Sequence, residues 1–205
     1  MNTSNSAVSN SASSNLARPK IYLVRHATPD WSRTDIRYDI PPGPPLVAQG
    51  EAEAASLGEF LRTVGAYKIY FSPLERTLRT AQIAAEIAQL PVFEEEAIAE
   101  WRRGESEQQV LERLMPFWEK ISLESQENGP IVMVSHGGPV RALLQHLKLE
   151  QAEIDFYRKQ FDRDNPVPPA GAWLATQARF DERWQLQLAF TPQPHKVYTP
   201  PLVYV

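Results

Sequence analysis

The sequence contains no cysteine, no long apolar run and no excess of positive charge, and each absence excludes a class of protein. Without cysteine there can be no disulfide, no thiolate nucleophile and no cysteine-ligated zinc. No apolar run approaches the roughly 20 residues that a membrane-spanning helix needs. A net charge of -4 argues against a general nucleic-acid or membrane-surface binder, because both of those partners are themselves anionic.

The N-terminal stretch also lacks the parts of a signal peptide. Residues 1–15 are rich in serine, asparagine and alanine, without a basic region or an apolar core. We expect a disordered tail over residues 1–19, a single folded domain over residues 20–205 and a cytoplasmic protein. Hydrophobic residues make up 42% of the chain, which is enough for a sizeable core, and nothing in the sequence indicates the oligomeric state.

After residue 20 the chain alternates between strand-like and helix-like segments, a pattern typical of an α/β domain. Strands are expected over residues 20–25, 68–71, 92–93 and 131–135, and helices over residues 50–64, 72–89, 106–122, 140–149 and 151–161. In this prediction Ser72 caps the second helix and Pro116 breaks or kinks the third. Residues 172–180 and 184–190 predict a hairpin around residues 181–182, followed by an extended proline-rich tail.

Two similar apolar runs each end in a histidine, His26 and His136. Both runs have the length and β-branched content of a buried parallel strand. Ligands of open α/β sheets bind outside the carboxyl ends of the strands, so the two histidines are expected to meet in one crevice. Arg25 precedes the first histidine and Gly137-Gly138 follows the second, a combination that indicates a site for an oxyanion.

Two further residues are expected at the same edge of the sheet: Arg76, in the first turn of the second helix, and Glu100, after the third strand. This set suits phosphoryl transfer, because a neutral imidazole is a nucleophile that needs no separate base. Arg25 and Arg76 supply forked donors for the phosphoryl oxygens, and His136 and the amides around Gly137 add further donors. Glu100 is the best-placed acid to protonate a departing alkoxide.

The long connection over residues 28–45 follows the first histidine directly, and we predict that it forms a wall of the active site. Thr28 and Ser32 are candidate substrate-binding residues within it. Simpler interpretations remain open: these hydroxyls could be ordinary loop groups, and Arg76 could be a solvated helix arginine. Glu105, Glu107 and Asp30 compete with Glu100 for the role of the acid.

Three segments together resemble the histidine phosphatase superfamily, which has the phosphoglycerate mutase-like fold. They are Leu23-Val24-Arg25-His26, Ser72-Pro73-Leu74-Glu75-Arg76-Thr77 with Thr80-Ala81, and Val134-Ser135-His136-Gly137-Gly138. The resemblance implies a three-layer α/β/α fold around a mixed, mostly parallel six-stranded sheet. It further implies that His26 becomes phosphorylated, that Arg25, Arg76 and His136 bind the phosphoryl group, and that an acid at the position of Glu100 protonates the leaving group. The chain departs from the family at residues 27–28, where Ala-Thr replaces the common Gly-Glu.

Four functions are compatible with these residues. The first is a phosphomonoesterase that acts through a phosphohistidine on a small phosphorylated metabolite or a phosphorylated side chain, without cofactor or metal. The second is a phosphoglycerate-type mutase, which is disfavoured because the stretch between Arg76 and His136 leaves little room for a larger lid. The third is a non-catalytic phosphate-binding regulatory module. The fourth, a metal hydrolase, is disfavoured because adjacent arginines repel a divalent cation.

Overall fold

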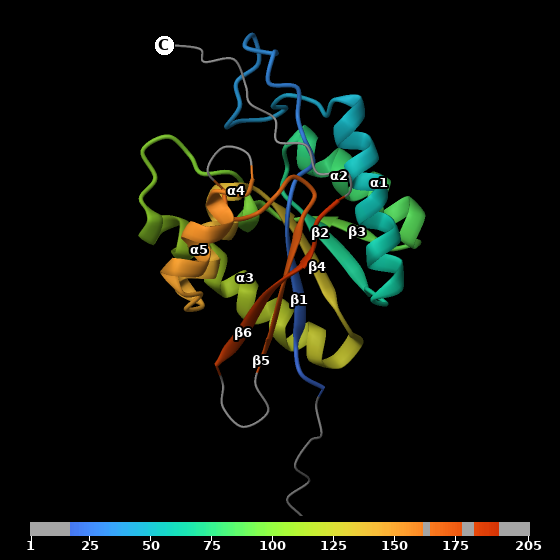
Figure 1. The fold of residues 1–205 in the computed structure, drawn as a ribbon, viewed down its shortest axis with the longest axis vertical. Helices are drawn as coiled ribbons and strands as arrows, with labels where there is room; N and C mark the ends of the chain where they lie inside the picture. Colours follow the sequence, from blue (N-terminus) through green and yellow to red (C-terminus); the bar gives the residue numbers. More distant parts are fainter. Residues whose placement is uncertain (1–16, 162–164, 178–182, 193–205) are drawn as a thin grey trace, which may run out of the picture.

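The computed structural model describes residues 17–161, 165–177 and 183–192 (Figure 1). The terminal tails and the turn at residues 181–182 that the sequence predicted lie outside the described residues. In chain order the elements are β1 (Lys20–Arg25), α1 (Ala48–Thr63), β2 (Lys68–Phe71), α2 (Glu75–Ala88), β3 (Val92–Glu94), the 3-10 helix η1 (Glu96–Ile98), α3 (Glu107–Asn128), β4 (Ile131–Ser135), α4 (Gly137–His146), α5 (Gln151–Arg158), β5 (Ala172–Gln177) and β6 (Trp184–Phe190).

The strands form one six-stranded sheet in the order β3-β2-β4-β1-β5-β6. Strands β1 to β4 pair in parallel, whereas β5 is antiparallel to β1 and β6 is antiparallel to β5. Helices α1 and α2 cover one face of this sheet, and α3, α4 and α5 cover the other (Figure 1). The predicted three-layer α/β/α architecture with a mixed, mostly parallel sheet is therefore confirmed.

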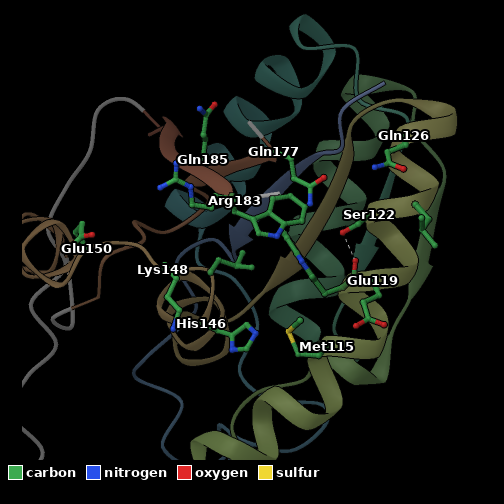
Figure 2. A pocket seen from close by; sticks show the side chains of 14 residues that line it. Met115, Glu119, Ser122, Gln126, His146, Lys148, Glu150, Gln177, Arg183 and Gln185 are labelled. Atoms are coloured by element: carbon green, nitrogen blue, oxygen red, sulfur yellow. Dashed lines mark hydrogen bonds between the residues drawn. The ribbon is translucent and has the colours of Figure 1, made fainter. Parts of the chain in front are cut away.

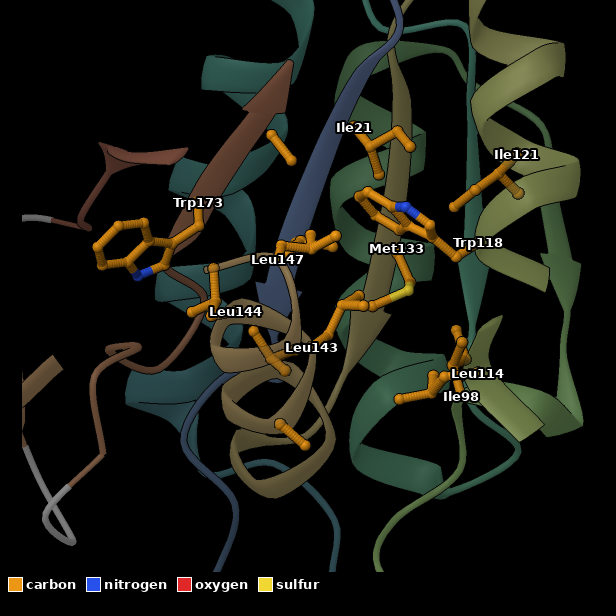
Figure 3. Packing of buried hydrophobic residues seen from close by; sticks show 14 of the residues in the cluster. Ile21, Ile98, Leu114, Trp118, Ile121, Met133, Leu143, Leu144, Leu147 and Trp173 are labelled. Carbon is orange, nitrogen blue, oxygen red and sulfur yellow. The ribbon is translucent and has the colours of Figure 1, made fainter. Parts of the chain in front are cut away.

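The central strands are apolar on both faces because both faces are covered by helices. In β1, Ile21 and Leu23 join the core cluster under α3 and α4, whereas Tyr22 and Val24 join the cluster under α1 and α2. Figure 3 shows the first cluster, in which Trp118 of α3 and Leu143 of α4 point toward the central strands. Burial on both sides fixes β1 and β4 at the centre of the sheet, which is the position that the site requires.

Helix α3 runs through Pro116 to Asn128, so the proline does not break it, and the helix ends beyond the predicted residue 122. A proline inside a helix costs about 3 kcal/mol. Leu114, Phe117, Trp118 and Ile121 are all buried, and each contributes roughly 1.5–3 kcal/mol by leaving water. The burial of this face outweighs the missing hydrogen bond, so the helix continues.

Two helix starts also differ from the prediction. Helix α2 begins at Glu75 with Leu74 at the N-cap, so Ser72 is not its cap. Helix α4 begins at Gly137, two residues before Pro139, because the amides of a helix's first turn have no intrahelical acceptor and a proline there loses nothing. Between residues 94 and 103, which the sequence predicted to be irregular, lies the 3-10 helix η1. Within the described residues, no helix is both long enough and apolar enough to cross a membrane.

The close packing of α1 on α2 predicts the effect of one substitution. A Cβ atom at Gly58 would lie 2.8 Å from the carbonyl oxygen of Ala84 and 2.9 Å from the Cβ of Ile87. Replacing a glycine by alanine within an exposed helix stabilises it by up to about 1 kcal/mol. Gly58→Ala should instead destabilise the protein by about 1–3 kcal/mol, because the two helices must separate.

Thermal unfolding measures this difference. For a protein of this size, about 1 kcal/mol corresponds to a Tm change of about 2–4 °C. The control is Glu59→Ala at the next residue, whose side chain is 57% exposed, and it should leave Tm nearly unchanged. A higher Tm for Gly58→Ala would contradict the close helix contact.

Candidate active site

The two strand-end histidines lie side by side at one edge of the sheet. Strands β1 and β4 are paired neighbours, with Arg25 opposite Ser135, and the amide of His26 donates to the carbonyl of Ser135 at 2.9 Å. The ring centroids of His26 and His136 are 5.4 Å apart, and both side chains are fully buried. The predicted meeting of the two histidines is confirmed, and their roles in a reaction stay predictions.

The hydrogen bonds of His26 determine which of its ring nitrogens can act as a nucleophile. Its Nδ1 lies 2.7 Å from the carbonyl oxygen of Ala27. A carbonyl can only accept, so Nδ1 carries the proton and Nε2 keeps its lone pair. That Nε2 lies 3.1 Å from the hydroxyl of Tyr38, which donates to it. His26 is therefore oriented with its unprotonated nitrogen toward Tyr38, in the loop over residues 28–45.

Two buried arginines flank the histidines. Nη1 of Arg25 donates to the carbonyl of Val167 at 3.1 Å. Arg76, in the first turn of α2, donates from Nη1 to the carbonyl of Tyr38 at 2.8 Å and from Nη2 to Glu100 at 3.1 Å. Its Nε is buried and makes no hydrogen bond with the described residues. Two cations inside the protein, one of them with an unused donor, form an environment that favours an anion.

His136 is held by a residue to which the sequence analysis gave another role. The hydroxyl of Ser72 lies 2.7 Å from Nε2 of His136, so Ser72 positions this histidine instead of capping α2. Burial and the nearby charge of Arg76 hold the pKa of His136 well below its usual value, so the imidazole is neutral in the empty site. Its Nδ1 lies 3.5 Å from Glu100 and has no hydrogen-bond partner among the described residues.

Glu100 joins the site from the segment that follows η1. Its side chain is buried, and besides Arg76 it accepts a hydrogen bond from the amide of Trp101 at 2.9 Å. Arg113 of α3 supports this segment by donating to the carbonyls of Ala97 and Glu100. Burial raises the pKa of the Glu100 carboxyl, and the charge of Arg76 opposes that rise only in part. The carboxyl consequently retains its proton to a higher pH than an exposed glutamate does.

Two of the competing acids are engaged elsewhere. Burial raises the pKa of Glu105, but its hydrogen bonds to Arg113 and to the amide of Arg102 outweigh burial and lower the pKa overall. Asp30 is half-buried, and the hydroxyl and the amide of Ser32 lower its pKa. Both carboxyls therefore favour the ionised form, which is the wrong form for a proton donor.

The predicted substrate-binding residues differ in their surroundings. Gly137 opens α4, and a Cβ atom there would lie 1.9 Å from the side-chain amide nitrogen of Asn165, so a larger residue would displace the Asn165 side chain. The hydroxyl of Thr28 donates to Glu53 at 2.9 Å, and that of Ser32 donates to Asp30 at 2.6 Å. Gly137 thus lies next to His136, whereas both hydroxyls are bound to carboxylates outside the cluster of arginines and histidines. Substrate binding by these three residues stays a prediction.

The sequence analysis missed Tyr38 and Asn165 as parts of the site. It did predict that the loop over residues 28–45 forms a wall of the site, and the contact of Tyr38 with His26 confirms this. The sequence offered one indication that Tyr38 could belong to the site, namely that it is an aromatic residue within a long loop next to His26. Asn165 carried no comparable signal, because it follows α5 without a recognisable pattern.

A cavity lies away from the two histidines and the two arginines, at the end of the sheet where β1 begins. Its volume is about 1020 Å³, and its lining comes from α3, the end of α4, and β5 and β6 (Figure 2). Trp118 and Trp184 contact each other in this lining, and His146 and Lys148 lie at the side of α4. The cavity contains neither of the paired histidines, so its size does not identify it as the reaction site. In the described part of the chain, no three metal-ligating side chains gather at any one place.

Comparison with known proteins gives the following matches. A sequence profile described as the histidine phosphatase superfamily (branch 1) matches residues 21–107 and 95–165. The chain is 28% identical over 167 residues to PhoE of Bacillus subtilis, named an uncharacterized phosphatase, covering 67% of this chain and 82% of PhoE. It is 36% identical over 95 residues to GpmB of Klebsiella pneumoniae, named a probable phosphoglycerate mutase, covering 46% of this chain and 44% of GpmB.

Two solved structures have the same fold. A mycobacterial glucosyl-3-phosphoglycerate phosphatase superposes with a TM-score of 0.64 at 21% identity, covering 83% of this chain and 97% of its own. A phosphoglycerate mutase from Bacillus anthracis superposes with a TM-score of 0.68 at 16% identity, covering 85% of this chain and 93% of its own. At these identities the likeness concerns the fold alone.

The protonation of His136 can be measured directly. Because burial and Arg76 both disfavour the imidazolium, His136 of the ligand-free protein should stay neutral at pH 6.5, where an unstructured histidine is about half protonated. Nitrogen NMR of the histidine rings measures this, and the loss of one signal in His136→Gln assigns it. A His136 signal that titrates near pH 6.5 would contradict the buried, neutral state.

Proposed function

The chain belongs to the histidine phosphatase superfamily, and from this premise we propose that it is a phosphomonoesterase that forms a phosphohistidine on His26. Its proposed substrates are small phosphorylated metabolites or phosphorylated side chains. The observation that carries the proposal is the state of His26: Nδ1 is bonded to Ala27, and Nε2 keeps its lone pair beside two buried arginines. The reaction needs a nucleophile in this state, because only the unprotonated nitrogen can attack phosphorus.

In the first half-reaction, Nε2 of His26 forms a bond to phosphorus while the ester P–O bond breaks. Glu100 gives its proton to the departing alkoxide, and its raised pKa supports this role because the carboxyl must be protonated when the substrate arrives. The products are an alcohol and a phosphoenzyme. The carboxylate that Glu100 becomes is then stabilised by Arg76, whose Nη2 already lies 3.1 Å away.

In the second half-reaction, water attacks phosphorus and the P–N bond breaks. The ionised Glu100 now takes a proton from the attacking water, so the same carboxyl serves both steps and returns to its protonated form. His26 leaves as a neutral imidazole, because its proton stays on Nδ1, hydrogen-bonded to the carbonyl of Ala27, throughout. Inorganic phosphate is released, and every proton is accounted for.

Arg25, Arg76, His136 and the amides at the start of α4 would bind the phosphoryl oxygens. Removing a donor aimed at charge that develops in the transition state costs about 3–4 kcal/mol in a water-excluded site. A dianionic phosphoryl group would also raise the pKa of His136, so that this histidine could become a charged imidazolium once substrate is bound. We propose no metal and no organic cofactor for this chemistry, because the arginines supply the positive charge.

The first test is chemical trapping of the phosphoenzyme. A rapid acid-free quench after mixing with labelled phosphomonoester should leave base-stable, acid-labile label on the protein, as expected for a phosphohistidine. His26→Ala should abolish the label because the attacking nitrogen is gone, while His146→Ala, in the exposed last turn of α4, should retain it. Label that persists in His26→Ala would assign the nucleophile to another residue.

The role of Glu100 is tested by the acidity of the leaving group. A poor leaving group such as an alkoxide needs a proton, whereas p-nitrophenolate hardly does. Glu100→Gln should therefore slow phosphoenzyme formation from an alkyl phosphate by about 10²–10⁴-fold and from p-nitrophenyl phosphate far less. Glu105→Gln is the matched control and should not separate the two substrates.

The pH dependence of kcat/KM tests whether Glu100 acts in its protonated form. Donation requires the protonated carboxyl, so kcat/KM for the alkyl phosphate should fall as pH rises through the raised pKa of Glu100. This fall should be absent in Glu100→Gln. An equal loss on both substrates, with the pH limb unchanged, would mean that Glu100 only supports the structure.

A phosphoglycerate-type mutase is the second candidate, since GpmB and the Bacillus anthracis structure carry that name. A mutase must protect its phosphohistidine from water and transfer the group to a second substrate. The decay of the trapped phosphoenzyme separates the two: a phosphatase loses the group to water within its turnover time, whereas a mutase retains it until a phosphoglycerate is added.

A further inference from the structure

Tyr38 occupies the space that a phosphoryl group needs on His26. Its hydroxyl lies 3.1 Å from the reacting nitrogen Nε2, the distance at which an attacked phosphorus atom would lie before the bond forms. By donating to Nε2, this hydroxyl also engages the lone pair that the attack requires. Tyr38 therefore covers the nucleophile of the proposed reaction.

The same residue covers Arg76. The guanidinium carbon lies 3.8 Å from the centre of the Tyr38 ring, and Nη1 donates to the Tyr38 carbonyl at 2.8 Å. A cation over an aromatic face is attracted to it, and a carbonyl replaces the oxygen that an anion would supply. Tyr38 thus contacts His26 through its hydroxyl, and it contacts Arg76 through its ring and its backbone carbonyl.

The loop that carries Tyr38 is held at its two ends, at Tyr38 and at Pro42, whose carbonyl accepts from the amide of Glu75 at 2.7 Å. At its base, residues 29 and 46 form a β-bridge, and the amide of Asp30 donates to the carbonyl of Pro45 at 2.7 Å. The ion pairs of the loop, Arg33–Asp35 and Arg37–Asp39, are local to it. Trp31 stacks on Tyr38 with the ring centroids 4.9 Å apart, which is again a contact within the loop.

Tyr38 is hydrogen-bonded to His26 and to Arg76, and nearby Pro42 accepts from the amide of Glu75. The hydrogen bonds that Tyr38 makes with His26 and Arg76 therefore use groups that the proposed function assigns to the phosphoryl ligand. A phosphoryl group bound to Nε2 of His26 and the Tyr38 hydroxyl cannot occupy the same place, and an oxygen bound at Nη1 of Arg76 would compete with the Tyr38 carbonyl. Binding of one requires release of the other.

We propose that Tyr38 is an internal competitor for the phosphoryl site, which phosphate and phosphomonoesters must displace together with the loop over residues 30–45. This inference rests on the proposed phosphoryl site at His26. When a binding site is open for only a fraction of the time, the apparent affinity falls by that fraction. Tyr38 therefore weakens the binding of the product phosphate and selects substrates whose leaving group contributes binding of its own.

The test measures the binding of inorganic phosphate to the full-length protein by titration calorimetry. Tyr38→Ala removes the hydroxyl and the ring, and it should bind phosphate at least about tenfold more tightly than the wild type, as expected if the site is open about one tenth of the time. Tyr38→Phe removes only the hydrogen bond to Nε2 and should give a smaller gain. Tyr67→Ala, which makes the same change at a 40% exposed position on the connection before β2, should bind like the wild type.

The results of Tyr38→Ala and Tyr38→Phe test the inference, and those of Arg76→Ala and of all variants together test the proposed phosphoryl site on which it rests. Equal or weaker binding by Tyr38→Ala would show that Tyr38 is a bystander or a substrate-binding residue, although phosphohistidine trapping could still succeed. Should Tyr38→Ala fail to fold, Tyr38→Phe decides, since unchanged or weaker binding by that variant excludes competition at Nε2. Binding that survives Arg76→Ala, or no binding by any variant, would exclude the phosphoryl site itself.

Discussion

Arg25 of β1 lies opposite Ser135 of β4, and this register carries His26 and His136 past the last pair to the same edge of the sheet. Successive residues of a strand alternate between its faces, so a slip of one residue would exchange the side chains that pack under α3 and α4 with those that pack under α1 and α2. The register is held because β1 and β4 are buried on both sides by apolar residues. The position of the two histidines is thus a consequence of core packing, and the site needs no separate device to bring them together.

Burial and Arg76 act differently on the two ionisable neighbours of the site. Burial disfavours charge on either group, so it lowers the pKa of His136 and raises that of Glu100. Arg76 favours the deprotonated form of both. The two influences therefore add at His136, which is firmly neutral, and oppose each other at Glu100, which is the better placed of the two to exchange a proton. A bound dianion would offset the charge of Arg76 and raise both pKa values.

The sequence predicted the parts of this arrangement that depend on local patterns. The strand at residues 68–71 was predicted with its observed bounds, and the strand that begins at residue 131 was predicted to end at His136, because short β-branched runs between turn signals are typical of strands. The sequence did not decide whether Pro116 breaks the helix, since the burial of Trp118 and Ile121 depends on contacts with distant strands. Ser72 misled the prediction: its place before a proline suggested a cap, but His136, 64 residues later, provides its partner. Tyr38 could not be assigned for the same reason, because its contacts depend on the path of a long loop.

The contacts of Tyr38 also reduce the free-energy cost of keeping buried donors and acceptors in place for an anion. Buried donors and acceptors without partners cost roughly 1–3 kcal/mol each, so a site that waits empty is expensive to maintain. Here the carbonyl of Tyr38 accepts from Arg76, its ring lies against the guanidinium, and its hydroxyl meets Nε2 of His26. The loop thereby satisfies much of the site in the absence of a ligand, and it does so with atoms that are exposed to solvent once the loop leaves. A phosphoryl group would then replace the contacts of Tyr38 with Arg76 and His26 instead of binding to donors that have no partner. The same few contacts therefore contribute to the stability of the fold and reduce the affinity for the ligand.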